Sequence, residues 1–302
     1  MKTGRLVCGV LAALPLLSLA PAASAAGGRG GVQAVSLIDT GSGARSRAYW
    51  TTRRMEDATP VDARGEDVSP EAGPPAGTPS ARSSSGSKVI GALFFNDGNG
   101  NHYCTASVIH TSKKNLLLTA AHCLYNPRTH QWNAHIVFVP KYSQGHRPYG
   151  TWPVWLMVVD KRWSDHGDPD LDFGFAAVQV MGGRRIVDMV GANQLLIHPG
   201  YSNNVTVIGY PSKANYPSDR PIRCTTKTYK QSNYQVGFDC RRFYGGTSGS
   251  PWIKGYDSKT QSGYVIGAIG GYQRGGAYDW RSYSAVFDSD IARLITTANN
   301  QA

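Results

Sequence analysis

The chain has 302 residues, of which 41% are hydrophobic and 17% are charged. This composition excludes a wholly disordered chain and a coiled coil, and 35 glycines, 17 prolines and 16 tyrosines favour a turn-rich β protein over a helical one. The formal charge of +11 would suit an acidic partner, but lysine and arginine never run longer than two, so we expect no specific nucleic-acid binding.

Residues 1–25 are typical of a secretory signal peptide. A positively charged start precedes the mostly apolar residues 6–20 and the small-residue site Ala23-Ser24-Ala25, after which we expect cleavage. The apolar stretch is too short for a membrane anchor. We therefore predict a secreted, extracellular protein that has no membrane contact once the signal is removed.

Secretion also predicts disulfides, because the extracellular environment is oxidising. Cys8 would leave with the signal peptide, and an even number of cysteines would remain: Cys104, Cys123, Cys224 and Cys240. Three pairings are possible. We expect the local pairs Cys104–Cys123 and Cys224–Cys240, each of which closes a loop of about 15–20 residues and would contribute ~3 kcal/mol.

Residues 26–87, called the N-terminal segment below, differ from the rest of the chain. Residues 69–87 read SPEAGPPAGTPSARSSSGS and contain almost no large apolar side chain. Such a stretch is not expected to bury enough surface to offset its ordering entropy. A flexible linker is one interpretation, and a propeptide that is removed or cut near its end is the one that a secreted chain favours.

From residue 88 onward, short apolar or alternating runs are bounded by turn residues, at 89–95, 136–139, 154–159, 173–180, 205–210, 264–269 and 283–287. This spacing predicts an antiparallel β sandwich or barrel. One helix is expected at the C-terminus, where Asp288 or Ser289 can cap it. Its apolar residues at helical spacing should pack on the last strand: Ile291, Leu294, Ile295 and Ala298.

Three segments contain the residue types of nucleophilic catalysis: LTAAHC at 118–123, DLDFGFA at 170–176 and GGTSGSPW at 245–252. A serine needs an imidazole to take its proton and a carboxylate to orient that imidazole, and glycines let backbone N–H groups face a developing oxyanion. Each segment alone is often structural, but together they indicate a serine hydrolase. Asp170 and Asp172 would point the same way in a strand, so periodicity does not choose between them.

These three segments resemble the signatures of the chymotrypsin-like serine peptidases. The GxSGSP form and the single disulfide at the histidine are more similar to the secreted bacterial branch that includes the glutamyl endopeptidases. The resemblance covers residues 88–300 and implies an all-β fold of two six-stranded antiparallel β-barrels with a C-terminal helix. The barrels would span 88–185 and 186–302, with residues 181–200 crossing between them and the active site in the cleft.

The resemblance also implies the roles of the site residues. His122 would be the general base, Asp172 would orient it, and Ser248 would be the nucleophile. The N–H groups of Gly246 and Ser248 would form the oxyanion hole, and Cys104–Cys123 would brace the histidine loop. The family places its acid directly before the hydrophobic strand, which favours Asp172 over Asp170.

One departure concerns activation. Thr247 stands where digestive trypsin-type enzymes carry an aspartate that pairs with the newly freed N-terminus. We therefore do not expect activation through such a pair. Residues 89–91 (VIG) still resemble a mature N-terminus of the family, so cleavage near Arg82 or Lys88 is plausible.

The primary specificity stays open. Ile269 stands where glutamyl endopeptidases carry a histidine, and Phe243 and Tyr244 replace small hydroxyl residues, which argues against glutamate selectivity. Residues 88–302 contain no glutamate. An enzyme that cuts at glutamate would gain from this absence because it would not cleave itself, although compositional drift explains the absence too. Asp239 could provide an acid for basic substrates, but it lies farther before Ser248 than in trypsin-type enzymes.

The predicted function is a secreted serine endopeptidase, a monomer that acts on proteins or peptides without a cofactor or metal. One alternative is a catalytically inactive binding module of the same fold, although such relics usually lose a triad residue. Another is an esterase of a different fold. Such enzymes normally place the serine in a G-x-S-x-G turn between a strand and a helix, with the histidine after the serine, and this chain matches neither feature. An acidic cluster could offer oxygens to Ca²⁺ but is expected to be a solvated loop: Asp165, His166, Asp168 and Asp170.

Overall fold

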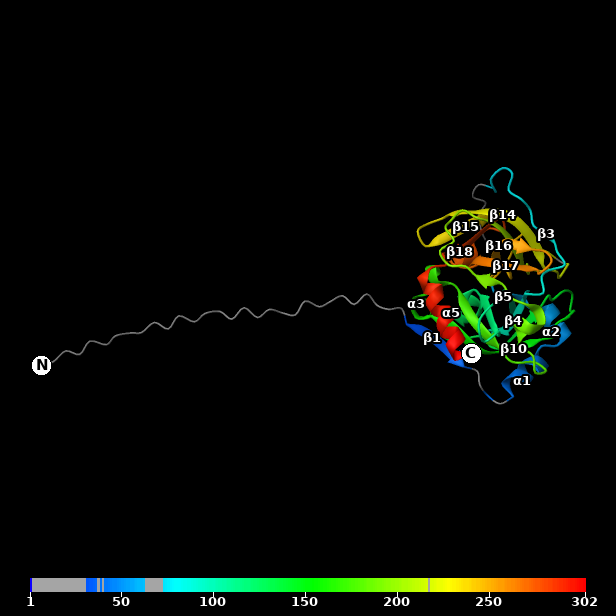
Figure 1. Ribbon diagram of the computed structural model, residues 1–302, viewed down its shortest axis with the longest axis horizontal. Coiled ribbons are helices and arrows are strands. Elements are labelled where there is room, and N and C mark those ends of the chain that lie inside the picture. The colour runs from blue at the N-terminus through cyan, green and yellow to red at the C-terminus, as the bar shows by residue number, and fades with distance from the viewer. Residues whose placement is uncertain (2–30, 37–38, 40, 63–72, 217) are drawn as a thin grey trace.

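The computed structural model describes residues 1, 31–36, 39, 41–62, 73–216 and 218–302. The predicted signal peptide, apart from Met1, lies outside the described residues. Two β-barrels are stacked on each other, one in the lower and one in the upper part of the molecule as drawn in Figure 1. This arrangement confirms the predicted all-β fold.

The first barrel is closed by six antiparallel strands: β4 (Ile90–Asn96), β5 (Asn101–Ile109), β6 (Leu116–Thr119), β9 (Ala134–Pro140), β10 (Trp152–Asp160) and β11 (Gly174–Val178). The strands follow the order β10-β11-β6-β5-β4-β9, and β9 pairs back with β10 to complete the ring. Most of these residues are buried, so the apolar runs predicted as strands form its core. A small hairpin, β7 (Tyr125–Asn126) and β8 (Gln131–Trp132), projects after β6.

The second barrel also has six antiparallel strands: β13 (Asn204–Gly209), β14 (Ile222–Lys230), β15 (Gln235–Asp239), β16 (Pro251–Asp257), β17 (Ser262–Ala268) and β18 (Arg281–Ala285). Their order is β17-β16-β13-β14-β15-β18. The two end strands meet where Ala268 N–H donates to Ser284 Oγ and, just beyond, Gly270 N–H donates to the Tyr283 carbonyl. Edge-to-face aromatic contacts of Phe238 with Trp252 and Phe243 fill the core.

The connection between the barrels contains helix α4 (Ile186–Val190) and strand β12 (Gln194–Leu195). β12 pairs in parallel with β17 of the second barrel. Just before it, Asn193 N–H donates to the Val108 carbonyl of the first barrel. The connection is therefore hydrogen-bonded to both barrels.

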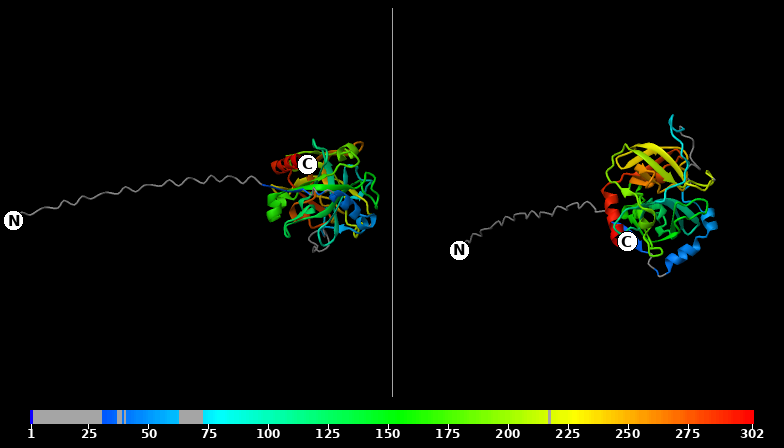
Figure 2. Two further views of the ribbon diagram at one scale, coloured as in Figure 1. Left: turned by 90° about the horizontal axis from the view of Figure 1, so that it is seen from below. Right: turned by 45° about the vertical axis from the view of Figure 1, so that its right-hand side comes forward.

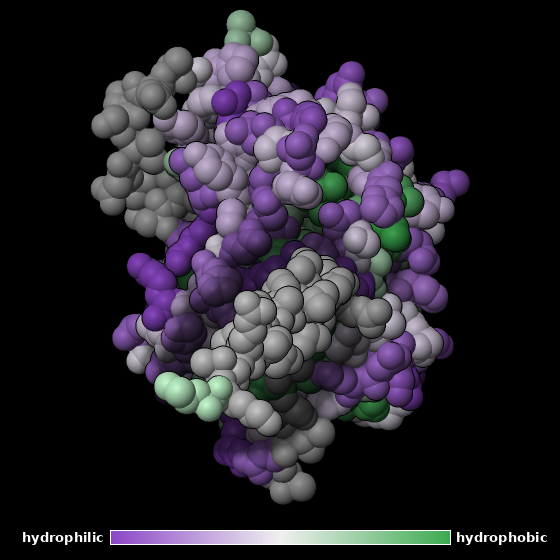
Figure 3. Space-filling model, turned by 90° about the vertical axis from the view of Figure 1, so that its left-hand side faces the viewer, coloured by the Kyte–Doolittle hydropathy of each residue, from purple (hydrophilic) through white to green (hydrophobic). Residues whose placement is uncertain are grey.

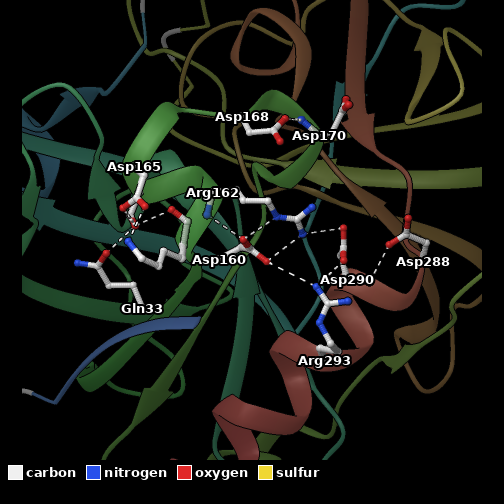
Figure 4. Close-up of polar contacts among 11 residues, drawn as sticks. Gln33, Asp160, Arg162, Asp165, Asp168, Asp170, Asp288, Asp290 and Arg293 are labelled. Atoms are coloured by element: carbon white, nitrogen blue, oxygen red, sulfur yellow. Dashed lines mark hydrogen bonds and ion pairs between the residues drawn. The ribbon is translucent and has the colours of Figure 1, made fainter. Parts of the chain in front are cut away.

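The C-terminal helix α5 (Ser289–Gln301) forms as predicted, and the Asp288 side chain accepts the Asp290 N–H at its start. The predicted packing on the last strand is wrong, because α5 packs on β10 and β11 of the first barrel. Phe287, just before α5, contacts Phe173 of the first barrel edge to face, at the point where the chain passes from the second barrel to the first. Arg162, in helix α3 (Lys161–His166), then pairs with Asp290 at 2.8 Å (Figure 4).

The N-terminal segment is built into the fold. β1 (Val32–Ser36) pairs with β10, β2 (Thr59–Pro60) pairs in parallel with β5, and β3 (Arg82–Ser83) pairs with β14. Helices α1 (Ser42–Tyr49) and α2 (Thr52–Asp57) lie against the first barrel, α1 at its lower end and α2 at its right-hand side in Figure 1 (see also Figure 2).

Residues 69–87 were not expected to bury enough surface to offset their ordering entropy, yet Ala81 and Ser87 are buried. These residues use the existing barrel surface instead of a core of their own.

The face beside α3 and α5 is mostly hydrophilic, and its hydrophobic residues form separate patches (Figure 3). No helix in the described part of the chain combines the length and the apolar character that a bilayer crossing needs.

Candidate active site

His122 lies in the short 3-10 helix η1 (Ala121–Cys123), which follows β6 of the first barrel. Cys123, its neighbour, forms a disulfide with Cys104 in β5 and so ties this turn to the sheet. The second disulfide joins Cys224 in β14 to Cys240 just after β15. Both predicted pairings are therefore present, and the histidine turn is covalently braced.

Asp172 lies between the 3-10 helix η2 (Pro169–Leu171) and β11, which begins at Gly174, and is almost completely buried beside His122. Its Oδ2 lies 2.8 Å from His122 Nδ1, and its Oδ1 accepts the His122 backbone N–H at 3.0 Å. Its Oδ2 also accepts the Gly271 N–H at 2.9 Å. Asp170 accepts instead from Gln235 Nε2 at 2.7 Å, so the structure brings Asp172 and not Asp170 to the imidazole.

Burial opposes the ionisation of Asp172, but the interaction with His122 and the backbone N–H donors outweigh it. The pKa of the Asp172 carboxyl is therefore held below its usual range. A carboxylate at this place can orient the imidazole and stabilise its charged form.

Ser248 lies in the turn between β15 and β16, where two glycines adopt left-handed backbone angles: Gly246 (φ +86°) and Gly249 (φ +81°). The Ser248 carbonyl accepts the N–H of Thr105 in the first barrel at 2.8 Å. A Cβ on Gly249 would lie 2.1 Å from the Thr105 carbonyl oxygen, so this position requires glycine. The serine turn of the second barrel is thus closely packed against the first.

Asp62, a residue of the N-terminal segment, contacts the candidate site residues. Ser248 Oγ donates to Asp62 Oδ2 at 2.5 Å, and Gly246 N–H donates to Asp62 Oδ1 at 3.0 Å. The same Oδ2 lies 4.0 Å from His122 Nε2. Within the described residues, Nε2 has no hydrogen-bond partner. His122 and Ser248 therefore face one carboxylate oxygen instead of bonding to each other.

No sequence signal pointed to Asp62. It is one of four aspartates in the N-terminal segment, and no motif surrounds it. Its contact with Ser248 spans 186 positions of the chain, so local pattern could not reveal it.

Thr247 is buried, and its hydroxyl donates to the Tyr244 carbonyl at 2.7 Å. Val89, at the start of the VIG sequence, is also buried, and its N–H donates to Ser87 Oγ at 3.2 Å. The serine turn is thus hydrogen-bonded internally while the N-terminal segment is still attached.

The residues considered for specificity have structural partners. Ile269 is buried and pairs through its backbone with Gly249 and Ser250. Phe243 is part of the second core. Asp239 forms two hydrogen bonds with the Arg281 guanidinium, at 2.8 and 3.1 Å, so a cation of the chain already neutralises its charge.

The acidic cluster considered for Ca²⁺ has separate partners as well. Asp168 accepts the Asp170 N–H (Figure 4). Asp165 pairs with Lys161, and Asp170 accepts from Gln235. Within the described ranges, these acids do not form a group whose ligand atoms converge. The cluster carries no metal-site assignment.

Solved structures share this architecture. Protease Anisep from Arthrobacter nicotinovorans matches with a TM-score of 0.65 and 25% identity, over 73% of this chain and 99% of that one. A thermostable serine protease, AL20 from an extremophilic microorganism, matches with a TM-score of 0.66 and 24% identity, over 72% and 100%. A Glu endopeptidase in complex with MPD gives 0.59 and 16%, over 74% and 98%. The chain has the chymotrypsin-like fold of bacterial serine proteases.

Sequence comparisons give weaker matches than the structural ones. No profile of a known protein family matches the chain. An extracellular metalloprotease of Bacillus subtilis (strain 168) is 25% identical over 173 residues, which are 56% of this chain and 51% of the relative. The chain thus spans about half the length of that curated relative.

Proposed function

We propose that this protein is a secreted serine endopeptidase that hydrolyses peptide bonds through an acyl-enzyme intermediate. The observation that carries the proposal is the convergence of His122 and Ser248, from different barrels, on one carboxylate oxygen. Asp172 is bonded to the opposite nitrogen of the imidazole. The chymotrypsin-like fold of the serine-protease neighbours supports the same reaction.

In this mechanism, His122 Nε2 takes the proton of Ser248 Oγ as that oxygen attacks the peptide carbonyl carbon. Asp172 keeps the imidazole proton on Nδ1, so that Nε2 is free to accept. The N–H groups of Gly246 and Ser248 stabilise the negative oxygen of the tetrahedral intermediate. His122 then gives the proton to the leaving amine, and water releases the acyl group by the same steps.

The curated relative is named a metalloprotease, so the potential metal ligands bear on the proposal. Among the described residues, Cys104, His122 and Cys123 bring three potential ligand atoms within 4.8 Å of one another. The two sulfurs are bonded to each other, so no thiolate is left for a metal, and His122 Nδ1 faces Asp172. These residues do not fit a metal, and we expect excess EDTA to leave the activity unchanged.

Secretion is part of the proposal. Two disulfides are typical of a protein that folds in an oxidising compartment. The predicted signal sequence at residues 1–25 fits the same destination.

The test uses protein from which limited proteolysis has removed the N-terminal segment. A fluorophosphonate probe should label Ser248, and a peptide library analysed by mass spectrometry should report cleavage and its side-chain preference. Ser248→Ala should lower kcat on the order of 10⁶-fold without changing the fold. Ser250→Ala is the matched control, because this serine is buried in the same turn and its Oγ has no partner within the described chain.

Peptide cleavage by Ser248→Ala at a rate comparable to wild type would refute the proposed mechanism. A processed protein that is folded but neither labels nor cleaves would favour the inactive binding module instead.

A further inference from the structure

The N-terminal segment covers the candidate nucleophile in the complete chain. Ser248 has no exposed surface, and only 5% of His122 is exposed. The side chain of Asp62 is itself 6% exposed, so it is enclosed between the two barrels' site residues instead of lying on the surface. A peptide substrate cannot reach Ser248 Oγ while this residue is in place.

Asp62 occupies the positions where the reacting atoms of a substrate would lie. One carboxylate oxygen accepts the Gly246 N–H, the proposed oxyanion donor, and the other accepts the Ser248 hydroxyl. Oxyanion donors are arranged for negative charge, so a carboxylate is a suitable ligand. It carries no amine leaving group, so Ser248 is not acylated by it.

The rest of the segment anchors this carboxylate. Strand β2 pairs with His102 and Tyr103 of β5 immediately before Asp62. Further upstream, Trp50 and Met55 are almost completely buried in the core cluster of the first barrel. The Trp50 indole N–H also donates to the His135 carbonyl at 2.5 Å.

The contact at Asp62 is close on its backbone side as well. A Cβ on Gly245 would lie 2.1 Å from the Asp62 carbonyl oxygen, so only glycine leaves room for the segment at this point. The serine turn and the segment are therefore complementary in shape.

The site under this cover is already assembled. Gly246 N–H points at an anion, Thr247 is hydrogen-bonded within its own turn, and His122 is bonded to Asp172. Latency in this chain therefore needs no distortion of the oxyanion turn. Occupation of the site is sufficient.

We propose that the N-terminal segment keeps the protein latent by placing the Asp62 carboxylate, as a product-like ligand, on Ser248 and the Gly246 N–H. Cleavage between Asp62 and Val89 then allows the segment to leave and exposes a preformed site. Arg82 in β3 is exposed and lies in this range. The inference rests on the proposed serine-peptidase function.

The experiment compares the chain 26–302 with its variants Asp62→Ala and Asp62→Asn. Asp57→Ala is the matched control, because Asp57 lies in the same segment with 68% of its side chain exposed. Each protein is treated with a fluorophosphonate, and labelling of the uncut band is followed on a gel. Each is then treated with trypsin to remove the segment and measured again, and thermal unfolding checks that the variants fold.

We expect Asp62→Ala to label about 10- to 100-fold faster than wild type, the range that loss of a charge-assisted hydrogen bond gives. Asp62→Asn keeps the shape without the charge, so its labelling rate should lie between those of wild type and Asp62→Ala. The labelling rate of Asp57→Ala should equal that of wild type. After trypsin treatment all four should label at one fast rate.

Equal labelling of uncut wild type and Asp62→Ala, with fast labelling after trypsin, would overturn the inference and leave the proposed function intact. Labelling of Asp62→Asn as slow as wild type would show that shape and not charge closes the site, which also overturns the role of the carboxylate. Absence of labelling and peptide cleavage in every processed sample would refute the proposed function and the inference together.

Discussion

Two carboxylates approach the imidazole of His122 from opposite sides, and they come from different regions of the molecule. Asp172 belongs to the first barrel, is almost completely buried and bonds to Nδ1 and to two backbone N–H groups. Asp62 belongs to the N-terminal segment, lies 4.0 Å from Nε2 and accepts from Ser248. In the proposed mechanism, position around the ring decides the effect of a negative charge: Asp172 would orient the base, and Asp62 would occupy the side from which the base works.

Among variants that separate these two regions, the largest expected effect is at the carboxylate of the barrel. Asp172→Asn should lower kcat of the processed protein about 10⁴-fold, because an amide favours the wrong imidazole tautomer. Steady-state hydrolysis of a peptide substrate measures the loss, and thermal unfolding shows whether the fold survives. A loss below tenfold would mean that another group orients His122.

The next effect concerns the anchor of the segment. Trp50→Ala removes a buried indole that contacts Phe94 of β4, and should weaken docking of the segment by about 3–5 kcal/mol. Hydrogen exchange of the α1 and α2 amides should speed up while exchange in β14 to β18 stays unchanged. Unchanged exchange in α1 and α2 would show that the segment is held elsewhere.

The smallest effect tests the neighbour of Asp172. Asp170→Asn removes the charge of a carboxylate that accepts from Gln235 Nε2, so we expect about 1 kcal/mol of destabilisation and activity within threefold of wild type. Urea unfolding and peptide hydrolysis of the processed protein measure both quantities. An activity loss as large as that of Asp172→Asn would contradict the division of roles between the two aspartates.

Much of the fold was predictable because the strands are largely buried and alternate with turn residues. The apolar runs at 89–95 and 205–210 became β4 and β13, and the local disulfides formed within single barrels. His122, Asp172 and Ser248 were singled out because three short motifs, each often structural alone, together indicate one chemistry.

What escaped prediction depends on contacts between distant parts of the chain. The partner of α5 is decided by Phe173 and Arg162, which lie more than one hundred residues earlier and belong to another barrel. The docking of the N-terminal segment had a weak signal, since Trp50 and Met55 are large apolar residues in a polar stretch. Asp62 had none, because its role arises only from the surface that it meets.

The course of α5 has a consequence for any attempt to dissect the molecule. This helix is continuous with the second barrel, yet Ile291, Leu294 and Ala298 are buried as it lies against β10 and β11. A fragment ending at residue 185 would expose the surface of β10 and β11 that α5 covers. The complementary fragment would carry α5 with its apolar face exposed to solvent. Each half should therefore self-associate when expressed alone, and co-expression should be needed to recover soluble material.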